Sequence, residues 1–139
     1  MMSQIETVQA FFACYREHDL NGMLALLSPG ARVDYVPMML EGPAGETGKT
    51  IWSSLMDGFP DLSNAVTAIY AADDRRTVIA EVTITGTQAK DVLGIANRGR
   101  SFSLPHVFIA RVDQDARIEF MRAYWDNAAL YAALSDAAA

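Results

Sequence analysis

Apolar side chains at spacings of three and four mark the first part of the chain as helical. Residues 3–18 carry such a pattern, which puts its apolar members on one face of a helix. These members are Ile5, Val8, Phe11, Phe12 and Tyr15. Ser3 is the predicted cap of this helix, and Asp19 the predicted cap of a second, short helix that Ser28-Pro29-Gly30 ends.

A third helix is predicted over residues 49–59, because Ile51, Trp52, Leu55 and Met56 have helical spacing and Pro60 follows. A short strand over residues 31–36 and a Gly- and Pro-rich loop over residues 41–48 precede it.

After Pro60 the pattern becomes that of strands, rich in β-branched and aromatic residues. The predicted strands are 65–71, 77–87, 101–112 and 117–125, with aspartate-rich turns between neighbours. Asp126 is the predicted cap of a last helix over residues 127–134. Helices followed by a run of antiparallel strands are typical of an α+β fold, in which helices pack on one face of a curved sheet.

Composition narrows the class of protein. The chain has 139 residues, 51% of them hydrophobic, and shows no repeat or linker, which predicts one domain over residues 1–139. A net charge of −6 disfavours nucleic acid as a partner. No apolar run reaches the length of a membrane span and no signal peptide is evident, so we expect no membrane association and a cytoplasmic location. The single cysteine, Cys14, lies on an apolar helical pattern and is interpreted as a small core residue.

Several segments resemble a known family. The sequence FFACYREHD at 11–19 resembles the first helix of nuclear-transport-factor-2-like domains. FPDL at 59–62 and YWD at 124–126 resemble the SnoaL-like polyketide cyclase branch of that class, and so do Gly94-Ile95, Gly99-Arg100 and Phe102 between them. The resemblance implies a cone-shaped, curved antiparallel sheet wrapped around N-terminal helices, the cystatin-like α+β barrel arrangement. It also implies an internal pocket for a hydrophobic small molecule, and homodimers.

Strand alternation predicts which side chains face that pocket. Tyr35, His106 and Trp125 fall on the apolar faces of their strands. The predicted substrate-binding residues are Tyr15, Trp52, Phe108, Met121, Ala123 and Trp125. On the opposite face, Val107, Ile109 and Tyr124 are apolar for a solvent-exposed surface, which predicts a homodimer through the outer face of the sheet.

Three residues are candidates for catalysis: His106, Tyr35 and Asp126. His106 could act as a general acid or base, be a buried, hydrogen-bonded histidine, or be an exposed residue at the end of a strand. Tyr35, like Tyr15, could donate to a developing oxyanion, or simply find a partner in the core. The resemblance implies an aspartate acid/base with a histidine close by; Asp126 is the nearest acid, although its face parity favours a helix cap.

Other activities of the fold class fit the chain less well. The resemblance to ketosteroid isomerases puts their catalytic base at Tyr35, and their oxyanion tyrosine and acid at Phe11 and Phe108. The pocket aspartate of limonene-epoxide-hydrolase-like enzymes falls at Ala123. None of these positions keeps the required side chain, so neither activity is expected.

Two functions remain open. One is a SnoaL-like enzyme that performs acid/base chemistry, of cyclase or isomerase type, on a hydrophobic polyketide-like or polycyclic molecule. The other is a small-molecule-binding or assembly domain without catalysis. No metal-ligand spacing and no nucleotide-binding motif is present, so neither a metal nor another cofactor is expected.

Overall fold

The computed structural model describes residues 2–135 and begins with two capped helices. Helix α1 spans Gln4–Arg16, and α2 spans Leu20–Ala25. Ser3 accepts from the backbone N–H of Glu6, whose side chain reaches back to Ser3, a reciprocal pair that fixes the start of α1. Asp19 accepts from Gly22 at the start of α2. Both predicted caps are confirmed.

Two further helices and two short turns complete the helical part. Helix α3 spans Lys49–Gly58 and α4 spans Asn127–Ser135, close to their predicted bounds. A 3₁₀ turn, η1, covers Val36–Met38, and a π-helical turn, η2, covers Ala44–Gly48. The segment predicted as the loop 41–48 is therefore ordered as a short strand that continues into η2 and α3.

Six strands form one curved sheet in the order β2-β1-β6-β5-β4-β3. Their bounds are Leu27–Tyr35 (β1), Leu40–Pro43 (β2), Ser63–Ala71 (β3), Thr77–Thr87 (β4), Ser101–Val112 (β5) and Ile118–Trp125 (β6). The strands β4 and β5 have their predicted bounds. Strand β1 begins earlier than predicted, because Ser28-Pro29-Gly30, expected to end a helix, lies in an irregular, extended part of β1.

The sheet is mixed and open. Strand β1 runs parallel to β6, with Tyr35 opposite Ala123, whereas the other neighbouring pairs are antiparallel. The prediction of a purely antiparallel sheet is wrong at this pair: β1 and β6 are distant in sequence, so no hairpin turn forces them to run in opposite directions. Strands β2 and β3 are the two edges, so the sheet does not close into a barrel. The predicted α+β fold with a curved sheet is confirmed.

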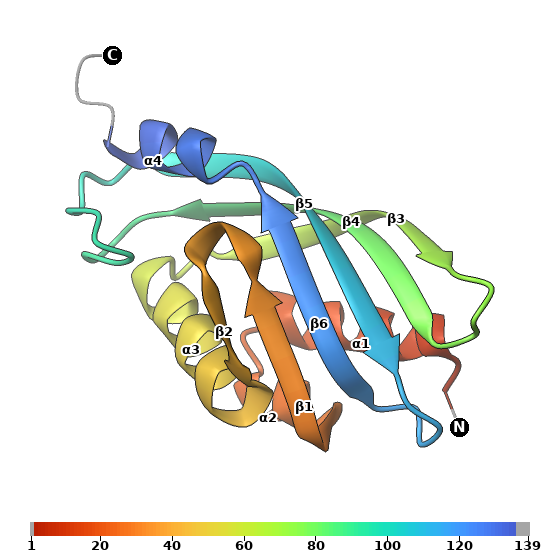
Figure 1. Cartoon of the computed structure of the whole chain (residues 1–139). Helices are drawn as coiled ribbons and strands as arrows, with labels where there is room; N and C mark the ends of the chain where they lie inside the picture. The colour runs from red at the N-terminus through yellow and green to blue at the C-terminus, as the bar shows by residue number, and fades with distance from the viewer. Residues whose placement is uncertain (1, 136–139) are drawn as a thin grey trace.

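The helices α1, α2 and α3 lie on one side of the sheet, and α4 lies over one end of it (Figure 1). The apolar face of α1 is buried against the sheet, and the rings of Phe12 and Phe108 meet edge to face with centroids 4.9 Å apart. In residues 2–135, no helix is long and apolar enough to cross a membrane.

Candidate active-site cavity

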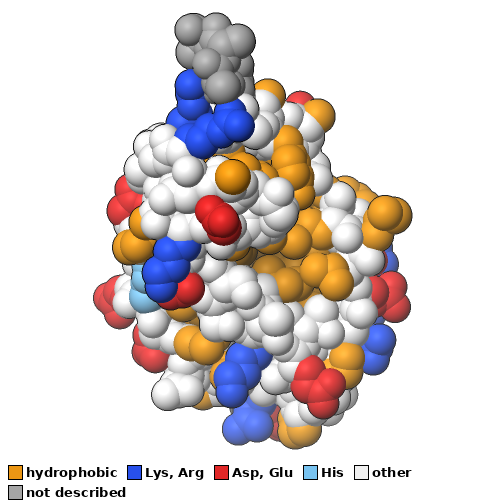
Figure 2. All heavy atoms as spheres, turned by 90° about the vertical axis from the view of Figure 1, so that its left-hand side faces the viewer, with side chains coloured by type: hydrophobic (Ala, Val, Ile, Leu, Met, Phe, Trp, Pro, Cys, Tyr) orange, Lys and Arg blue, Asp and Glu red, His pale blue; other side chains and the backbone are white. Residues whose placement is uncertain are grey.

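A cavity of about 40 Å³ lies between the sheet and the helices, at the end of the molecule that α4 covers. Its wall is mainly apolar and includes Met38 of η1, Ile51 and Leu55 of α3, Leu93 of the β4–β5 connection, and Leu130 of α4. Figure 2 shows hydrophobic side chains gathered in a hollow at this end of the molecule. The polar side chains that line the cavity are Tyr15, Tyr35 and His106.

His106 lies in β5 directly after Pro105 and is 9% exposed. Its Nδ1 lies 3.0 Å from the carbonyl oxygen of Leu104. Because a carbonyl only accepts, Nδ1 must carry the hydrogen in this contact, which leaves Nε2 unprotonated in the neutral ring. Burial lowers the pKa of His106 from 6.5 to about 4, although the bond to Leu104 opposes this shift. At neutral pH, His106 is therefore an uncharged base.

Aromatic rings hold His106 in place. The ring of Trp125 stacks on it with centroids 5.1 Å apart, and that of Phe108 lies parallel at 6.0 Å. Trp125 also meets Tyr35 edge to face at 5.8 Å, so one indole contacts both the histidine and the tyrosine. The Trp125 indole is itself fixed, because its N–H donates to Asn127 Oδ1.

Two tyrosines line the same cavity. Tyr35 ends β1, and its hydroxyl accepts a hydrogen bond of 2.5 Å from the indole N–H of Trp52. The hydroxyl of Tyr15, from α1, makes no hydrogen bond within residues 2–135, and this side chain lines the cavity. Burial raises the pKa of both tyrosines, so both are neutral donors at physiological pH.

Five of the predicted site residues therefore line one cavity: Tyr15, Tyr35, His106, Phe108 and Trp125. Trp52, Met121 and Ala123 do not line it in this structure. Trp52 is fully buried behind Tyr35, and Ala123 lies opposite both Tyr35 and Phe108 in the sheet. Side chains on the concave face of a sheet are not all at the cavity, because α1 covers part of that face.

Asp126 lies outside the cavity. Its carboxylate accepts from the backbone N–H of Ala129 at 3.0 Å and caps α4, and the residue is exposed. The prediction that Asp126 contributes an acid to the pocket therefore has no geometric support. The other histidine, His18, is half-buried, and its Nε2 lies 2.7 Å from the carbonyl oxygen of Leu62.

Some features of the cavity could not be predicted from the sequence. Met38, Leu93 and Leu130 reach it from a turn, a loop and a helix whose positions depend on the whole fold. The one local signal is at Leu93-Gly94, where both residues have positive φ and form a tight turn closed by Val92 and Ile95.

Within residues 2–135, no group of three His, Cys, Asp or Glu side chains could hold a metal ion.

Comparison with known proteins gives one family match and many structural matches. The sequence profile of the SnoaL-like domain matches residues 8–121. No curated protein matches the chain in sequence.

Three solved structures illustrate the likeness in fold. A protein from Jannaschia sp. CCS1, proposed to be a SnoaL-like polyketide cyclase, is 24% identical, with a TM-score of 0.81 over 95% of this chain and 91% of its own. AclR from Streptomyces galilaeus, a proposed hydroxylase, is 20% identical, with a TM-score of 0.80 over 92% of each chain. A protein of ketosteroid isomerase-like fold from Catenulispora acidiphila DSM 44928 is 16% identical, with a TM-score of 0.76 over 93% of this chain and 92% of its own.

Proposed function

The chain belongs to the SnoaL-like domain family, and on this premise we propose that it catalyses proton transfer on an uncharged, largely apolar ligand with a carbonyl group. The observation that carries the proposal is the tautomer of His106, whose Nδ1–H is committed to Leu104 and whose Nε2 is free to act as a base. The hydroxyls of Tyr35 and Tyr15 provide donors in the same cavity.

The proposed reaction uses these groups in sequence. Nε2 of His106 takes a proton from the carbon next to the ligand carbonyl, so that a C–H bond breaks and an N–H bond forms. The electron pair passes into the carbonyl, whose oxygen becomes an enolate oxygen and accepts from Tyr35. In a cyclase, the enolate carbon then attacks a second carbonyl of the same ligand. In an isomerase, whose ligand carries a β,γ double bond, the dienolate takes the proton back from His106 at its γ-carbon, and the double bond moves into conjugation. In the cyclase, His106 returns its proton to the new alkoxide.

The low pKa of His106 has two consequences for this reaction. A group of pKa about 4 is fully in its base form at neutral pH, but it is a weak base. The enolate formed beside it would stabilise the imidazolium, because an adjacent opposite charge favours the charged form. The proposal therefore requires the developing charge to lie close to both His106 and Tyr35.

The absence of charged side chains from the cavity wall supports an uncharged ligand. A carboxylate that bound there would lose its hydration, and no cation in the cavity wall would pair with it. Burial of such an unpaired charge is costly. We therefore expect a ketone, ester or phenol to bind in preference to a free acid.

The cavity must enlarge to admit a polycyclic molecule, since about 40 Å³ holds only a few water molecules. We propose that the β4–β5 connection moves, because Leu93 at its turn is one wall of the cavity. Such a movement would have to release the contacts that hold this turn: the Tyr131 hydroxyl donates to the Leu93 carbonyl, Gln88 Nε2 donates to the carbonyl of Ile95, and the Ile95 side chain is buried.

Hydrogen exchange on a model ketone tests the catalytic proposal. We expect the wild-type protein to accelerate exchange of the α-hydrogens of 2-tetralone for deuterium, followed by NMR in heavy water. His106→Gln should lower the rate by at least about 100-fold, in line with the usual effect of a general base. The matched control is His18→Gln, at the other histidine, which should retain the rate. A wild-type protein that binds 2-tetralone without accelerating exchange would favour the alternative, a binding domain without catalysis.

We also propose a homodimer through the outer face of the sheet. Val107 and Tyr124 lie opposite each other in β5 and β6 and are exposed by 36% and 40%. Adjacent apolar side chains on a solvent face support an interface. Light scattering should give twice the chain mass, and Val107→Glu should return it to the mass of one chain. A single-chain mass for the wild type at micromolar concentration would overturn the proposal.

A further inference from the structure

Trp52 is fully buried, and its indole has a fixed position. The ring meets Phe11 of α1 edge to face, with centroids 5.4 Å apart. On the other side it lies against the backbone of Gly48, where a Cβ atom would be only 2.8 Å from the Trp52 ring. An alanine at position 48 would therefore have to displace the indole.

The fixed indole aims its N–H at Tyr35. The N–H donates to the Tyr35 hydroxyl at 2.5 Å, between two side chains that are 0% and 4% exposed. An indole nitrogen is only a donor, so the Tyr35 oxygen must be the acceptor in this bond. No acceptor for the Tyr35 proton lies within hydrogen-bonding distance among residues 2–135. Since Tyr35 lines the cavity, its proton is left for a group inside the cavity.

We propose that Trp52 is a positioning residue that turns Tyr35 into a directed, polarised donor for an oxyanion in the cavity. This inference rests on the proposed function, because the oxyanion to which Tyr35 donates is the enolate oxygen of the proposed reaction. A hydroxyl that accepts one hydrogen bond donates a stronger one, since the bonds in a chain polarise one another. Burial raises the pKa of Tyr35, and the bond from Trp52 opposes that rise. The effect of this bond on the pKa means that the indole N–H stabilises negative charge on the Tyr35 oxygen.

The chain provides an internal control for this bond, because it has two tryptophans. The indole N–H of Trp125 donates to Asn127 Oδ1 at 3.1 Å and not to a tyrosine. The ¹H–¹⁵N spectrum should therefore contain two indole signals, with that of Trp52 displaced downfield by its short bond. Tyr35→Phe removes the acceptor and little else, and should move the Trp52 signal upfield. Asn127→Ala should move mainly the Trp125 signal.

Binding of 4-nitrophenol measures the effect on a ligand oxygen. The neutral and phenolate forms of 4-nitrophenol differ in absorbance. The affinity is measured at one pH above and one pH below the pKa of 4-nitrophenol. Both pH values lie above the pKa of His106, which is about 4, so His106 stays neutral throughout. In Trp52→Phe we expect the phenolate to bind about tenfold more weakly, as for a lost bond to a charged group, and the neutral form to change much less. Gly48→Ala, which keeps the N–H but displaces the ring, should produce the same selective loss to a smaller extent.

Each outcome bears on one of the two proposals. A Trp52 signal that does not respond to Tyr35→Phe overturns the positioning role, and so does an equal weakening of both forms of 4-nitrophenol in Trp52→Phe. A wild-type protein that binds neither form overturns the proposed function, and with it the role of Trp52 toward a ligand, even if the spectrum confirms the bond. Selective loss of phenolate affinity together with the upfield shift supports both proposals.

Discussion

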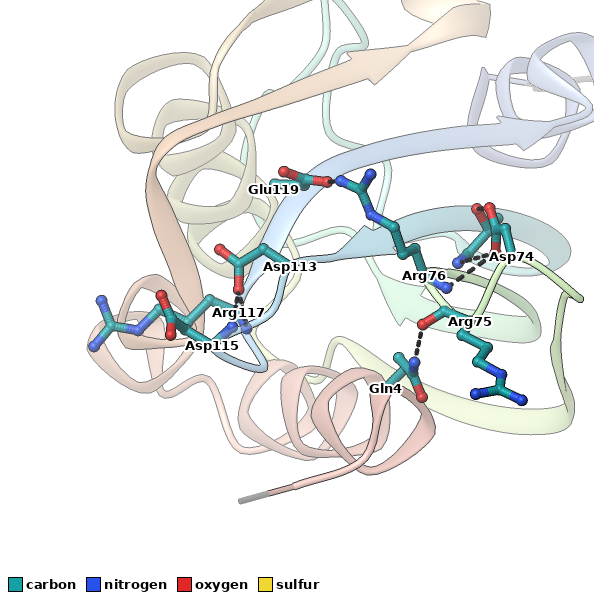
Figure 3. Close-up of polar contacts among 9 residues, drawn as sticks. Gln4, Asp74, Arg75, Arg76, Asp113, Asp115, Arg117 and Glu119 are labelled. Carbon is teal, nitrogen blue, oxygen red and sulfur yellow. Dashed lines mark hydrogen bonds and ion pairs between the residues drawn. The ribbon is translucent and has the colours of Figure 1, made fainter.

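The two ends of the sheet differ in whether their polar groups have hydrogen-bond partners. At the end formed by the β3–β4 and β5–β6 hairpins, polar groups meet partners close by (Figure 3). Asp74 accepts from the backbone N–H groups of Arg76 and Thr77, and Asp113 from those of Asp115 and Arg117. Between the hairpins, Arg76 pairs with Glu119.

At the cavity end, the hydroxyl of Tyr15 and Nε2 of His106 have no hydrogen-bond partner among residues 2–135. Buried polar groups normally find partners, because leaving one unpaired costs about 1–3 kcal/mol. The hairpin end therefore shows what this fold does when only stability is required. At the cavity end these two groups are left for a ligand, and neither is an enclosed unpaired atom, since Gln88 Oε1 is the one enclosed side-chain atom without a partner among residues 2–135.

The largest expected contrast is in side-chain truncation. Phe12→Ala, in the packed region against Phe108, should lower the free energy of unfolding by about 3–5 kcal/mol, because it leaves a cavity in a filled core. Leu93→Ala, at the half-buried cavity wall, should cost about 1 kcal/mol or less and should strengthen binding of an aromatic probe by widening the cavity. Urea denaturation and a fluorescence titration measure the two effects. Equal destabilisation by both changes would show that Leu93 belongs to the packed core.

A second contrast is in pH dependence. The unfolded chain binds a proton at His106 near pH 6.5, whereas the folded protein binds it only near pH 4. Between these values the unfolded state holds more protons, so stability falls as the pH is lowered through this window, by about 3 kcal/mol in total. The carboxyl group of Asp74, with a pKa lowered to about 2, loses its contribution at lower pH than this window.

Urea denaturation of the wild type and of His106→Gln between pH 7 and pH 4 isolates this effect, because the carboxyl groups are common to both proteins. The wild type should lose stability over this range, and the variant should lose about 3 kcal/mol less. Parallel curves for the two proteins would mean that His106 is solvated in the folded state.

The sequence predicts the hairpin end better than the cavity end. The bounds of β4 and β5 and the caps Ser3 and Asp19 follow from local patterns, since alternation and capping act between near neighbours. The parallel pairing of β1 with β6 has no local signal, because it joins segments at opposite ends of the chain.

The same distinction divides the site residues. Alternation correctly places His106 and Tyr35 on the concave face of the sheet, but it does not distinguish a residue at the cavity from one beneath a helix. Met121 and Ala123 are on the correct face and still do not line the cavity. The bond between Trp52 and Tyr35 joins a helix to a strand, and helical spacing only indicates that Trp52 is buried.

The smallest expected effect concerns Asp126, which lies next to the cavity in sequence but behaves like the aspartates of the hairpin end. Its carboxylate caps α4, so Asp126→Ala should lower the free energy of unfolding by about 1 kcal/mol, and Asp126→Asn, which keeps a capping oxygen, should change it little. If Asp126 were the acid of the reaction, Asp126→Asn would abolish exchange on 2-tetralone while leaving stability intact. We expect the opposite order, with exchange retained in Asp126→Asn and only stability lowered in Asp126→Ala, as measured by deuterium exchange and urea denaturation on the same samples. Loss of exchange in Asp126→Asn would place this carboxylate in the catalytic machinery and would remove the distinction drawn between the two ends of the molecule.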